Sequence, residues 1–205
     1  MTTPGDRPLS FEAIRAALAA RERRDYPFHD LQPEHLPEGG LRHAAVLVPL
    51  LERDGEICLL FTKRPMELRR HAGQVCFPGG RIDESDADDL AAALRETEEE
   101  IGLPPGNVEV LGRLDETLVL VSSFRLTPWV GRVPYPFPYA PHAQEVEEII
   151  VVPLRELAAP GAHRTQEVVA YGIPHEVHFY DVQGEVIWGA TARVVGQLLE
   201  VWKGR

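Results

Sequence analysis

The hydrophobic positions of this chain follow two patterns. Short apolar runs bounded by turn residues predict strands, and apolar residues that recur every three to four positions predict helices. Apolar runs at 41–51 and 56–62 flank Asp54-Gly55, a pair that is typical of a β-hairpin turn. A second pair, Gln183-Gly184, joins the apolar stretches 177–182 and 185–188. The remaining strands are expected over 74–77, 108–114, 117–121, 124–133 and 148–152.

Helices are expected where apolar residues recur every three to four positions. One is expected over 11–24 after Ser10, a residue type that favours an N-cap, and others over 154–157 and 191–202. A further helix follows the glycine pair at 79–80. This order of elements predicts an α+β fold with helices packed on a mixed β-sheet. The turn-rich segment 27–40 predicts a helical extension over 1–39, packed on a core domain over 40–205.

The length and charge of the chain limit the classes of function. A chain of 205 residues can bury a sizeable core, and its net charge of −11 argues against nonspecific binding to nucleic acid or to an anionic membrane. The cysteines, Cys58 and Cys76, lack the spacing of a zinc or redox motif. No signal-peptide pattern is present, and the run 44–51 is too short to span a bilayer, so we expect a cytoplasmic protein without a membrane partner.

The helix after the glycine pair concentrates carboxylates on one face. At about 100° per residue, Glu96, Glu99 and Glu100 lie together, and Glu98 lies nearly opposite, where we expect it to be solvated. An aliphatic stripe on another face is expected to be buried; it consists of Leu90, Leu94, Thr97 and Ile101.

Three like charges on adjacent turns repel each other, and they lie near the helix C-terminus, where the helix dipole disfavours anions. A hard divalent cation would resolve this conflict, and oxygen ligands suit Mg²⁺ or Mn²⁺. The alternative interpretation is an acidic helix face that is only solvated.

The segment from Arg95 to Leu103 resembles the second half of the Nudix box, the signature of the Nudix hydrolase superfamily. The box reads glycine, five residues, glutamate, seven residues, then Arg-Glu-apolar-any-Glu-Glu-any-Gly-apolar. The first half departs from it: five residues after Gly80 are followed by Asp86 instead of glutamate, and eight residues then precede Arg95.

This resemblance implies a Nudix-like domain over 40–205 and an enzyme that hydrolyses a diphosphate linkage with Mg²⁺ or Mn²⁺. It also implies that Glu96, Glu99 and Glu100 hold the metal and supply the base, with the Gly80 carbonyl as a further metal ligand. Arg95 is expected to orient one carboxylate through a charge-assisted pair. Glu145, in an acidic run after the box, is expected to add another carboxylate.

A second segment resembles the coenzyme A pyrophosphatase branch of the superfamily. Leu59-Leu60-Phe61-Thr62-Lys63-Arg64 is followed by His71-Ala72-Gly73-Gln74-Val75-Cys76-Phe77-Pro78-Gly79-Gly80, and 187–192 adds to the likeness. The branch implies that coenzyme A is cleaved to 3′,5′-ADP and 4′-phosphopantetheine. The alternatives are a hydrolase of ADP-ribose or another nucleoside diphosphate derivative, and a non-catalytic Nudix module that binds a nucleotide.

Cations just before the glycine pair are candidates for binding the substrate phosphates, because arginine binds phosphate bidentately. The candidate substrate-binding residues are Arg64, Arg69, Arg70, His71, Gly79 and Gly80. Each arginine could instead form a surface ion pair. The proline–aromatic segment 134–141 is either a packed surface loop or a wall of the substrate pocket.

Overall fold

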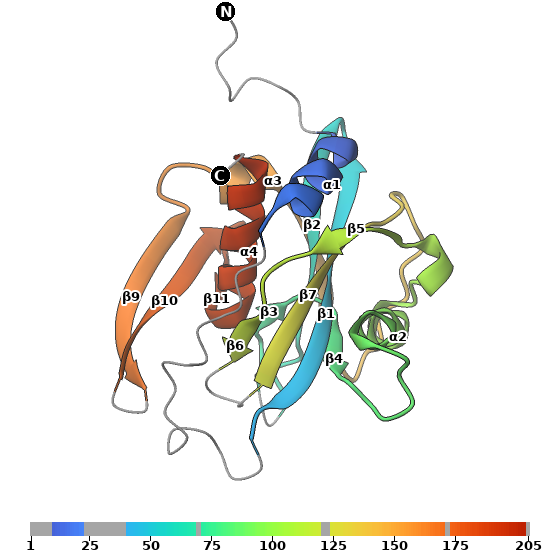
Figure 1. Cartoon of the computed structure of the whole chain (residues 1–205), viewed down its shortest axis with the longest axis horizontal. Coiled ribbons are helices and arrows are strands. Elements are labelled where there is room, and N and C mark those ends of the chain that lie inside the picture. Colours follow the sequence, from blue (N-terminus) through green and yellow to red (C-terminus); the bar gives the residue numbers. More distant parts are fainter. Residues whose placement is uncertain (1–9, 23–39, 69–70, 120–123, 171–172, 204–205) are drawn as a thin grey trace, which may run out of the picture.

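A computed structural model of the chain describes residues 10–22, 40–68, 71–119, 124–170 and 173–203. Within these ranges the strands form an eight-stranded mixed sheet and a separate three-stranded sheet (Figure 1). The main sheet has the strand order β3-β2-β1-β7-β5, with β4 on β1, β6 on β7 and β8 on β2. Its strands are β1 (Arg42–Arg53), β2 (Glu56–Lys63), β3 (Val75–Cys76), β4 (Gly79–Arg81), β5 (Glu109–Arg113), β6 (Thr117–Val119), β7 (Phe124–Arg132) and β8 (Glu148–Pro153).

Strand β1 lies at the centre of this sheet. It pairs antiparallel with β2 through the expected hairpin, in which Asp54 and Gly55 have positive φ angles of 55° and 78°. On its other side it pairs parallel with β7 over nine residue pairs, from Arg42 opposite Phe124 to Leu50 opposite Arg132. The parallel pair makes the sheet mixed, as the sequence predicts.

Both faces of β1 are covered, which explains its unbroken apolar run. Val46, Val48 and Leu50 belong to the core cluster that includes α1 and α4, whereas Leu47 and Leu51 pack with residues on the side of helix α2. Because successive side chains of a strand point to opposite faces, one strand supports both hydrophobic layers.

The helices cover the two faces of the main sheet. Helix α2 (Asp89–Ile101) packs on one face, while α1 (Phe11–Ala20) and α4 (Gly189–Trp202) lie on the other. Two short helices are η3 (Pro105–Asn107) and α3 (Leu154–Leu157). The expected α+β class, with a mixed sheet between helices, is confirmed. None of the helices in the described ranges is long and apolar enough to cross a membrane.

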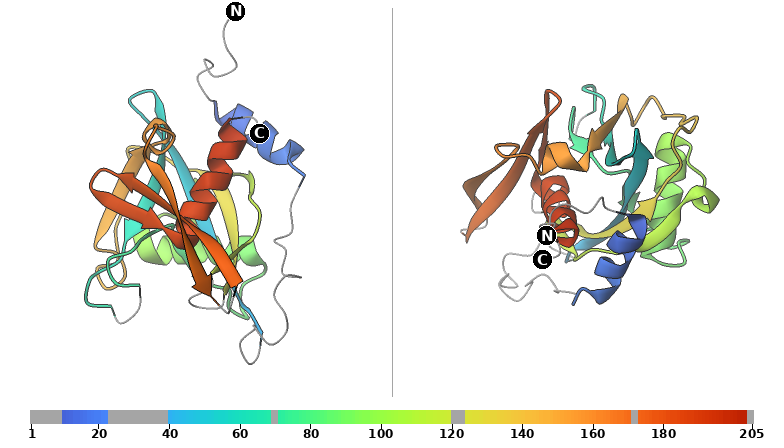
Figure 2. Two further views of the ribbon diagram at one scale, coloured as in Figure 1. Left: turned by 90° about the vertical axis from the view of Figure 1, so that its left-hand side faces the viewer. Right: turned by 90° about the horizontal axis from the view of Figure 1, so that it is seen from above.

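The second sheet consists of β9 (His163–Ala170), β10 (Ile173–Val182) and β11 (Glu185–Trp188), in the order β11-β10-β9. It lies beside the main sheet, with helix α4 between them (Figures 1 and 2). The expected β10–β11 hairpin is present, with β10 starting earlier than 177. Strand β9 was not expected, because its polar and charged residues do not show a strand period; it is stabilised by pairing with β10.

Two helix boundaries differ from the expectation, because α4 begins at Gly189 rather than at residue 191 and α1 is shorter than predicted. Helix α1 ends at Ala20 rather than at residue 24, while Ser10 caps it as expected by accepting a hydrogen bond from the Ala13 N–H at 3.2 Å. The connector over 27–39 lies outside the described residues, and the division of the chain at residue 39 stays a prediction.

The buried stripe of helix α2 also differs from the expected one. Thr97 and Ile101 are fully buried, as expected, but Leu90 and Leu94 are only partly buried. The other buried positions are Ala92, Ala93 and Glu100. Ala92 and Ala93 pack with Ala45 of β1, so small side chains meet where α2 contacts the sheet.

The proline–aromatic segment packs against the protein core. Phe137 and Tyr139 contact the cluster that contains Leu47 and Ile101, and the Tyr139 hydroxyl donates to the Pro134 carbonyl at 2.8 Å. These contacts favour a packed surface loop over a pocket wall.

Helix α1 is attached to the core through Phe11, Ile14 and Leu18, which are buried in the same cluster as α4. Ile14 is 1% exposed, so Ile14→Ala should lower the free energy of unfolding by about 2–5 kcal/mol, measured by urea denaturation. The neighbouring Arg15→Ala is the matched control, because its ion pair with Glu109 lies at the surface and should contribute less than about 1 kcal/mol. Equal effects of the two changes would contradict the docking of α1.

Candidate active site

The carboxylate cluster is held by a helix whose two ends are both capped. At the start of α2 the Asp88 side chain accepts a hydrogen bond from the Ala91 N–H at 2.8 Å. At its end Gly102 adopts a left-handed conformation, and its N–H donates to the Glu98 carbonyl. These caps set where the helix begins and ends, and so keep the turns that carry the glutamates helical.

The four glutamates of α2 differ strongly in exposure. Glu98 is exposed, as expected for the opposite face, and the side chain of Glu99 is 60% exposed. The side chain of Glu96 is 19% exposed, whereas Glu100 as a residue is only 3% exposed. On the expected shared face, the exposure of the glutamates therefore decreases from Glu99, which lies in solvent, to Glu100, which lies against the sheet.

Arg95 connects this cluster to the loop that precedes the helix. Its Nε donates to Asp86 Oδ1 and its Nη2 to Asp86 Oδ2, both at 2.9 Å, which is a bidentate pair. Its Nη1 donates to Glu96 Oε1 at 3.0 Å and lies 3.4 Å from the Glu99 carboxylate. These bonds hold the pKa of Asp86 at about 2 and keep Arg95 charged.

The Asp86 pairing explains the altered first half of the box. The side chain of Asp86 is 5% exposed, and its role as the anchor of Arg95 is not evident from the sequence. Its position, with five residues between it and Gly80, was the available signal.

Glu100 has a strongly perturbed environment. Burial raises its pKa to about 8, and the neighbouring Glu145 and Glu96 carboxylates raise it further, while Arg64 and a backbone hydrogen bond from Gly79 oppose the shift. Its Oε2 atom is buried and has no hydrogen-bond partner. Burial also raises the pKa of Glu96, with added repulsion from Glu99 and Glu145.

The structure brings Glu145 to the cluster, although it lies far along the chain. The His142 N–H donates to the Glu100 carbonyl at 2.8 Å, and the Glu145 N–H donates to the His142 carbonyl at 2.8 Å. The Glu147 N–H then donates to the Lys63 carbonyl at 2.8 Å at the end of β2. These backbone bonds attach the acidic turn to both α2 and the main sheet.

Gly80 lies directly against the Glu96 carboxylate. A Cβ atom at Gly80 would lie 2.5 Å from Glu96 Cδ and 2.6 Å from its Oε2, so the Glu96 carboxylate would have to move. Gly79 has a φ of 146°, and a Cβ there would lie 2.4 Å from the Ala45 carbonyl oxygen. The glycine pair thus allows backbone and carboxylates to approach each other closely.

The donor set fits a hard divalent cation. It combines carboxylate oxygens with a backbone carbonyl, and the unpartnered Glu100 Oε2 is the kind of buried anionic atom that Mg²⁺ or Mn²⁺ would stabilise. Among the described residues, however, no three acidic, histidine or cysteine side chains already converge as a metal-binding group. Glu96 and Glu99 instead direct oxygens toward Arg95.

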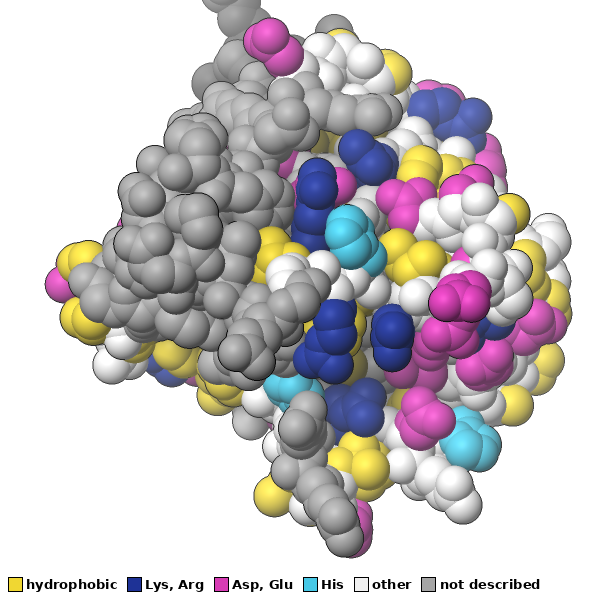
Figure 3. Space-filling view, turned by 60° about the horizontal axis from the view of Figure 1, so that its bottom comes forward, with side chains coloured by type: hydrophobic (Ala, Val, Ile, Leu, Met, Phe, Trp, Pro, Cys, Tyr) yellow, Lys and Arg dark blue, Asp and Glu magenta, His cyan; other side chains and the backbone are white. Residues whose placement is uncertain are grey.

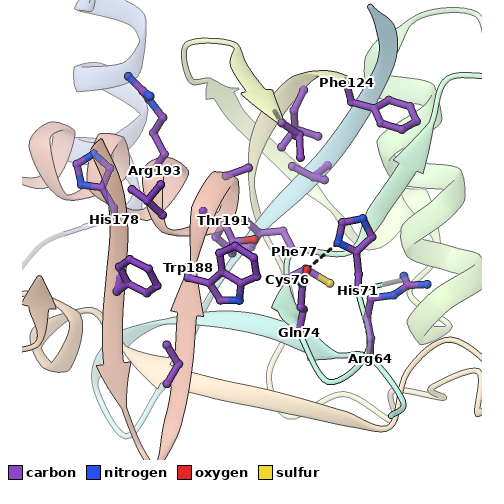
Figure 4. Close-up of a pocket in the computed structure, with 18 of the residues that line it drawn as sticks. Arg64, His71, Gln74, Cys76, Phe77, Phe124, His178, Trp188, Thr191 and Arg193 are labelled. Atoms are coloured by element: carbon purple, nitrogen blue, oxygen red, sulfur yellow. Dashed lines mark hydrogen bonds between the residues drawn. The ribbon is translucent and has the colours of Figure 1, made fainter. Parts of the chain in front are cut away.

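A cavity of about 1440 Å³ adjoins this site at the glycine pair and extends to the second sheet, while the clustered glutamates are not among its described lining residues (Figure 4). Gly79, Gly80, Arg64 and His71 line one end of it. His71 has a positive φ of 56°, and its Nδ1 lies 2.8 Å from Gln74 Oε1, a contact that orients the ring. Arg69 and Arg70 lie outside the described residues.

The other end of the cavity was not expected from the sequence. It is lined by residues of β10, β11 and α4, including His178, Trp188, Thr191 and Arg193. The likeness at 187–192 was the available signal. Figure 3 shows basic and histidine side chains gathered beside the acidic cluster on this face of the molecule.

The model of the NUDIX domain matches residues 41–171, well over half of the chain. This chain belongs to the Nudix hydrolase family. The Nudix hydrolase NudL of Escherichia coli K12 is 40% identical over 157 residues, which cover 77% of this chain and 81% of NudL. NudL of Cronobacter sakazakii is 42% identical over the same shares of both chains.

A solved structure supports the same fold. The MutT/nudix family protein from Enterococcus faecalis has a TM-score of 0.52 at 14% identity, covering 96% of this chain and 71% of that chain. As a Nudix hydrolase, the protein is an enzyme that acts on pyrophosphate bonds of small molecules, and enzymes of this family generally use divalent metal ions.

The contact between Gly80 and Glu96 can be tested with a single methyl group. Gly80→Ala should lower hydrolytic turnover at least about tenfold, because the methyl group must displace the Glu96 carboxylate. Gly106→Ala is the matched control: nothing lies within 4 Å of its Cβ, so its turnover should equal that of the wild type. Steady-state assays on both variants make the comparison, and an active Gly80→Ala enzyme would contradict this role of Gly80.

The raised pKa of Glu100 predicts a pH dependence of stability in the metal-free protein. Because the folded-state pKa is about 8 and the ordinary value is 4.5, the native state binds the proton more tightly than the unfolded state. The contribution of protonated Glu100 to the free energy of unfolding is complete below pH 4.5 and is lost as the pH rises through 8. Urea denaturation in EDTA should therefore show the wild type losing stability from pH 5 to pH 8.

Two variants isolate this effect. Glu100→Gln should lose most of the slope, whereas Glu98→Gln should keep it, because Glu98 is exposed. Added Mg²⁺ should restore stability to the wild type at pH 8. A Glu100→Gln variant with an unchanged slope would show that another group titrates.

Proposed function

We propose that this enzyme cleaves the diphosphate of coenzyme A, with Mg²⁺ or Mn²⁺, to give 3′,5′-ADP and 4′-phosphopantetheine. The observation that carries the proposal is the path of the 59–80 segment. This segment resembles the coenzyme A branch, and its Arg64, His71, Gly79 and Gly80 line one end of the cavity. The residues that distinguish the branch would thus contact the substrate directly.

The charges around the site are consistent with a polyanionic substrate. The protein as a whole carries a net charge of −11, so binding several phosphates requires local cations. Arg64 lies close enough to Glu100 to influence its pKa, and its Nε is buried without a hydrogen-bond partner. A phosphate oxygen would supply that partner. We assign Arg69 and Arg70 to the same substrate-binding group.

The proposed roles follow from exposure and contacts. Glu96, Glu99, Glu100 and the Gly80 carbonyl would hold the metal. Arg95, anchored by Asp86, would orient the Glu96 and Glu99 carboxylates. Glu145, on the turn hydrogen-bonded to Glu100, would hold or accept a proton of the attacking water. A bound divalent ion supplies charge neutralisation and a more acidic water molecule.

In the proposed reaction a water molecule attacks one phosphorus of the diphosphate, and the bond to the bridging oxygen breaks. One carboxylate of the cluster takes the proton of the water. A carboxylate with a raised pKa is suited to this step, because its proton affinity approaches that needed near neutral pH. In the same proposal, residues 40–205 form the catalytic domain and 1–39 its extension.

Product analysis tests this function. We expect coenzyme A to be cleaved with a higher kcat/KM than ADP-ribose, NADH or dinucleoside polyphosphates, and its products to be 3′,5′-ADP and 4′-phosphopantetheine by mass spectrometry. Turnover should vanish in EDTA and return with Mg²⁺ or Mn²⁺. Faster cleavage of ADP-ribose would favour a different Nudix specificity, and cleavage in EDTA would remove the metal mechanism.

The variants for this assay come from the same helix. Glu100→Gln should lower turnover at least about tenfold, because both metal binding and proton transfer need the charge. Glu98→Gln should be nearly silent, since Glu98 is exposed on the opposite face. A damaging Glu98→Gln change would show that the wrong helix face was assigned.

A further inference from the structure

Strand β11 presents an apolar face that no core residue covers. Val186 and Trp188 are 43% and 37% exposed, whereas Ile187 between them is 1% exposed and packs in the core. Alternate residues of a strand share a face, so Val186 and Trp188 point the same way. Both line the cavity that begins at Gly80. An exposed tryptophan inside a cavity is a candidate ligand contact.

The Trp188 ring stacks with an aromatic neighbour on β10. Phe179 pairs with Trp188 across the two strands, and their ring centroids are 6.4 Å apart with an interplanar angle of 14°. Phe179 is supported in turn by the Arg164 guanidinium, 4.2 Å from its ring centroid, and Arg164 Nε donates to Asp181 at 2.8 Å. Trp188 is stacked on Phe179, which Arg164 holds in place, and is therefore suited to stacking against another planar ring.

Trp188 lies across the cavity from the end that Arg64 and His71 line. Figure 4 shows the Trp188 ring beside the segment with Gln74, Cys76 and Phe77, and His71 across the cavity. The Lys63–Glu185 ion pair, at 2.5 Å, ties the start of β11 to the end of β2. A substrate with its diphosphate at Gly80 could therefore reach Trp188 with its remaining part.

The cavity lining also matches the charge of a nucleotide. Among the described lining residues, positively charged and histidine side chains outnumber carboxylates: Arg64, Arg81, Arg193, His71 and His178 stand against Glu176 and Glu185. The Glu185 carboxylate is already paired with Lys63. The cavity therefore combines sites for phosphate with a planar aromatic surface.

We propose that Trp188, backed by Phe179, binds the adenine base of the substrate by stacking and is a specificity-determining residue of this enzyme. The inference rests on the proposed function and adds the placement of the nucleotide half of coenzyme A. A purine offers a planar π surface, which a pair of near-parallel rings recognises better than the flexible pantetheine arm. The matched family range ends at residue 171, before β10 and β11, so this contact belongs to the part of the chain outside it.

Binding of AMP, ribose 5-phosphate and 4′-phosphopantetheine to the full-length enzyme tests this placement. We expect AMP to bind the wild type about tenfold more tightly than ribose 5-phosphate, because only AMP carries the base. Trp188→Ala should remove that difference and leave the affinity for the other two ligands unchanged. Calorimetry measures all three affinities, and Trp188→Phe should retain most of the AMP affinity.

Tryptophan fluorescence gives a second readout that does not depend on a damaging variant. The chain has three tryptophans, Trp129, Trp188 and Trp202. AMP should quench the wild-type fluorescence, the quench should disappear in Trp188→Phe, and it should persist in Trp202→Phe, because Trp202 does not line the cavity.

The possible outcomes separate this inference from the proposed function. Unchanged AMP binding in Trp188→Ala, or a loss confined to 4′-phosphopantetheine, would overturn the adenine placement. Failure to cleave coenzyme A would overturn the proposed function alone, because AMP is also part of ADP-ribose. Cleavage of coenzyme A with AMP binding independent of Trp188 would overturn only the stacking.

Discussion

The close approach of helix α2 to strands β1 and β4 is the constraint on which the site depends. The helix meets the sheet through Ala92 and Ala93, and the Glu96 carboxylate lies against the backbone of Gly80. At this separation Glu100 cannot reach solvent, and its carboxylate becomes buried beside the sheet. A side chain at Gly80 would displace the Glu96 carboxylate, so the close packing and the position of the carboxylates depend on the same contact.

The electrostatic cost of this arrangement is only partly offset within the protein. Arg95 neutralises part of the charge of Glu96 and Glu99, and Asp86 holds Arg95 in place with two hydrogen bonds. Glu100 receives less help, because Arg64 and one backbone N–H oppose a large desolvation effect. The remaining imbalance is what a divalent cation would relieve, and it links stability to metal binding in a way that a solvated acidic face would not.

The second sheet forms one side of the cavity, and the pattern of acidic residues in the sequence does not predict it. It is held to the main body by α4 packing and by the Lys63–Glu185 pair. Lys63 has a second role, because its carbonyl accepts the Glu147 N–H and so positions the turn that carries Glu145. Lys63, at the end of β2, therefore connects the strand that carries Trp188 with the acidic turn beside Glu100.

Local features of this protein were determined by the sequence itself, because they depend on residues only a few positions apart. The β1–β2 hairpin follows from Asp54-Gly55, the Ser10 cap from its side chain, and the grouping of Glu96, Glu99 and Glu100 from the helical period. Tertiary structure decided what depends on distant segments: the burial of Glu100, the proximity of Glu145 to the cluster, the pairing of β9 and the position of Trp188. A helical period sets the angle between side chains but not which side faces a sheet at close range. That choice comes from packing, and packing needs the whole chain.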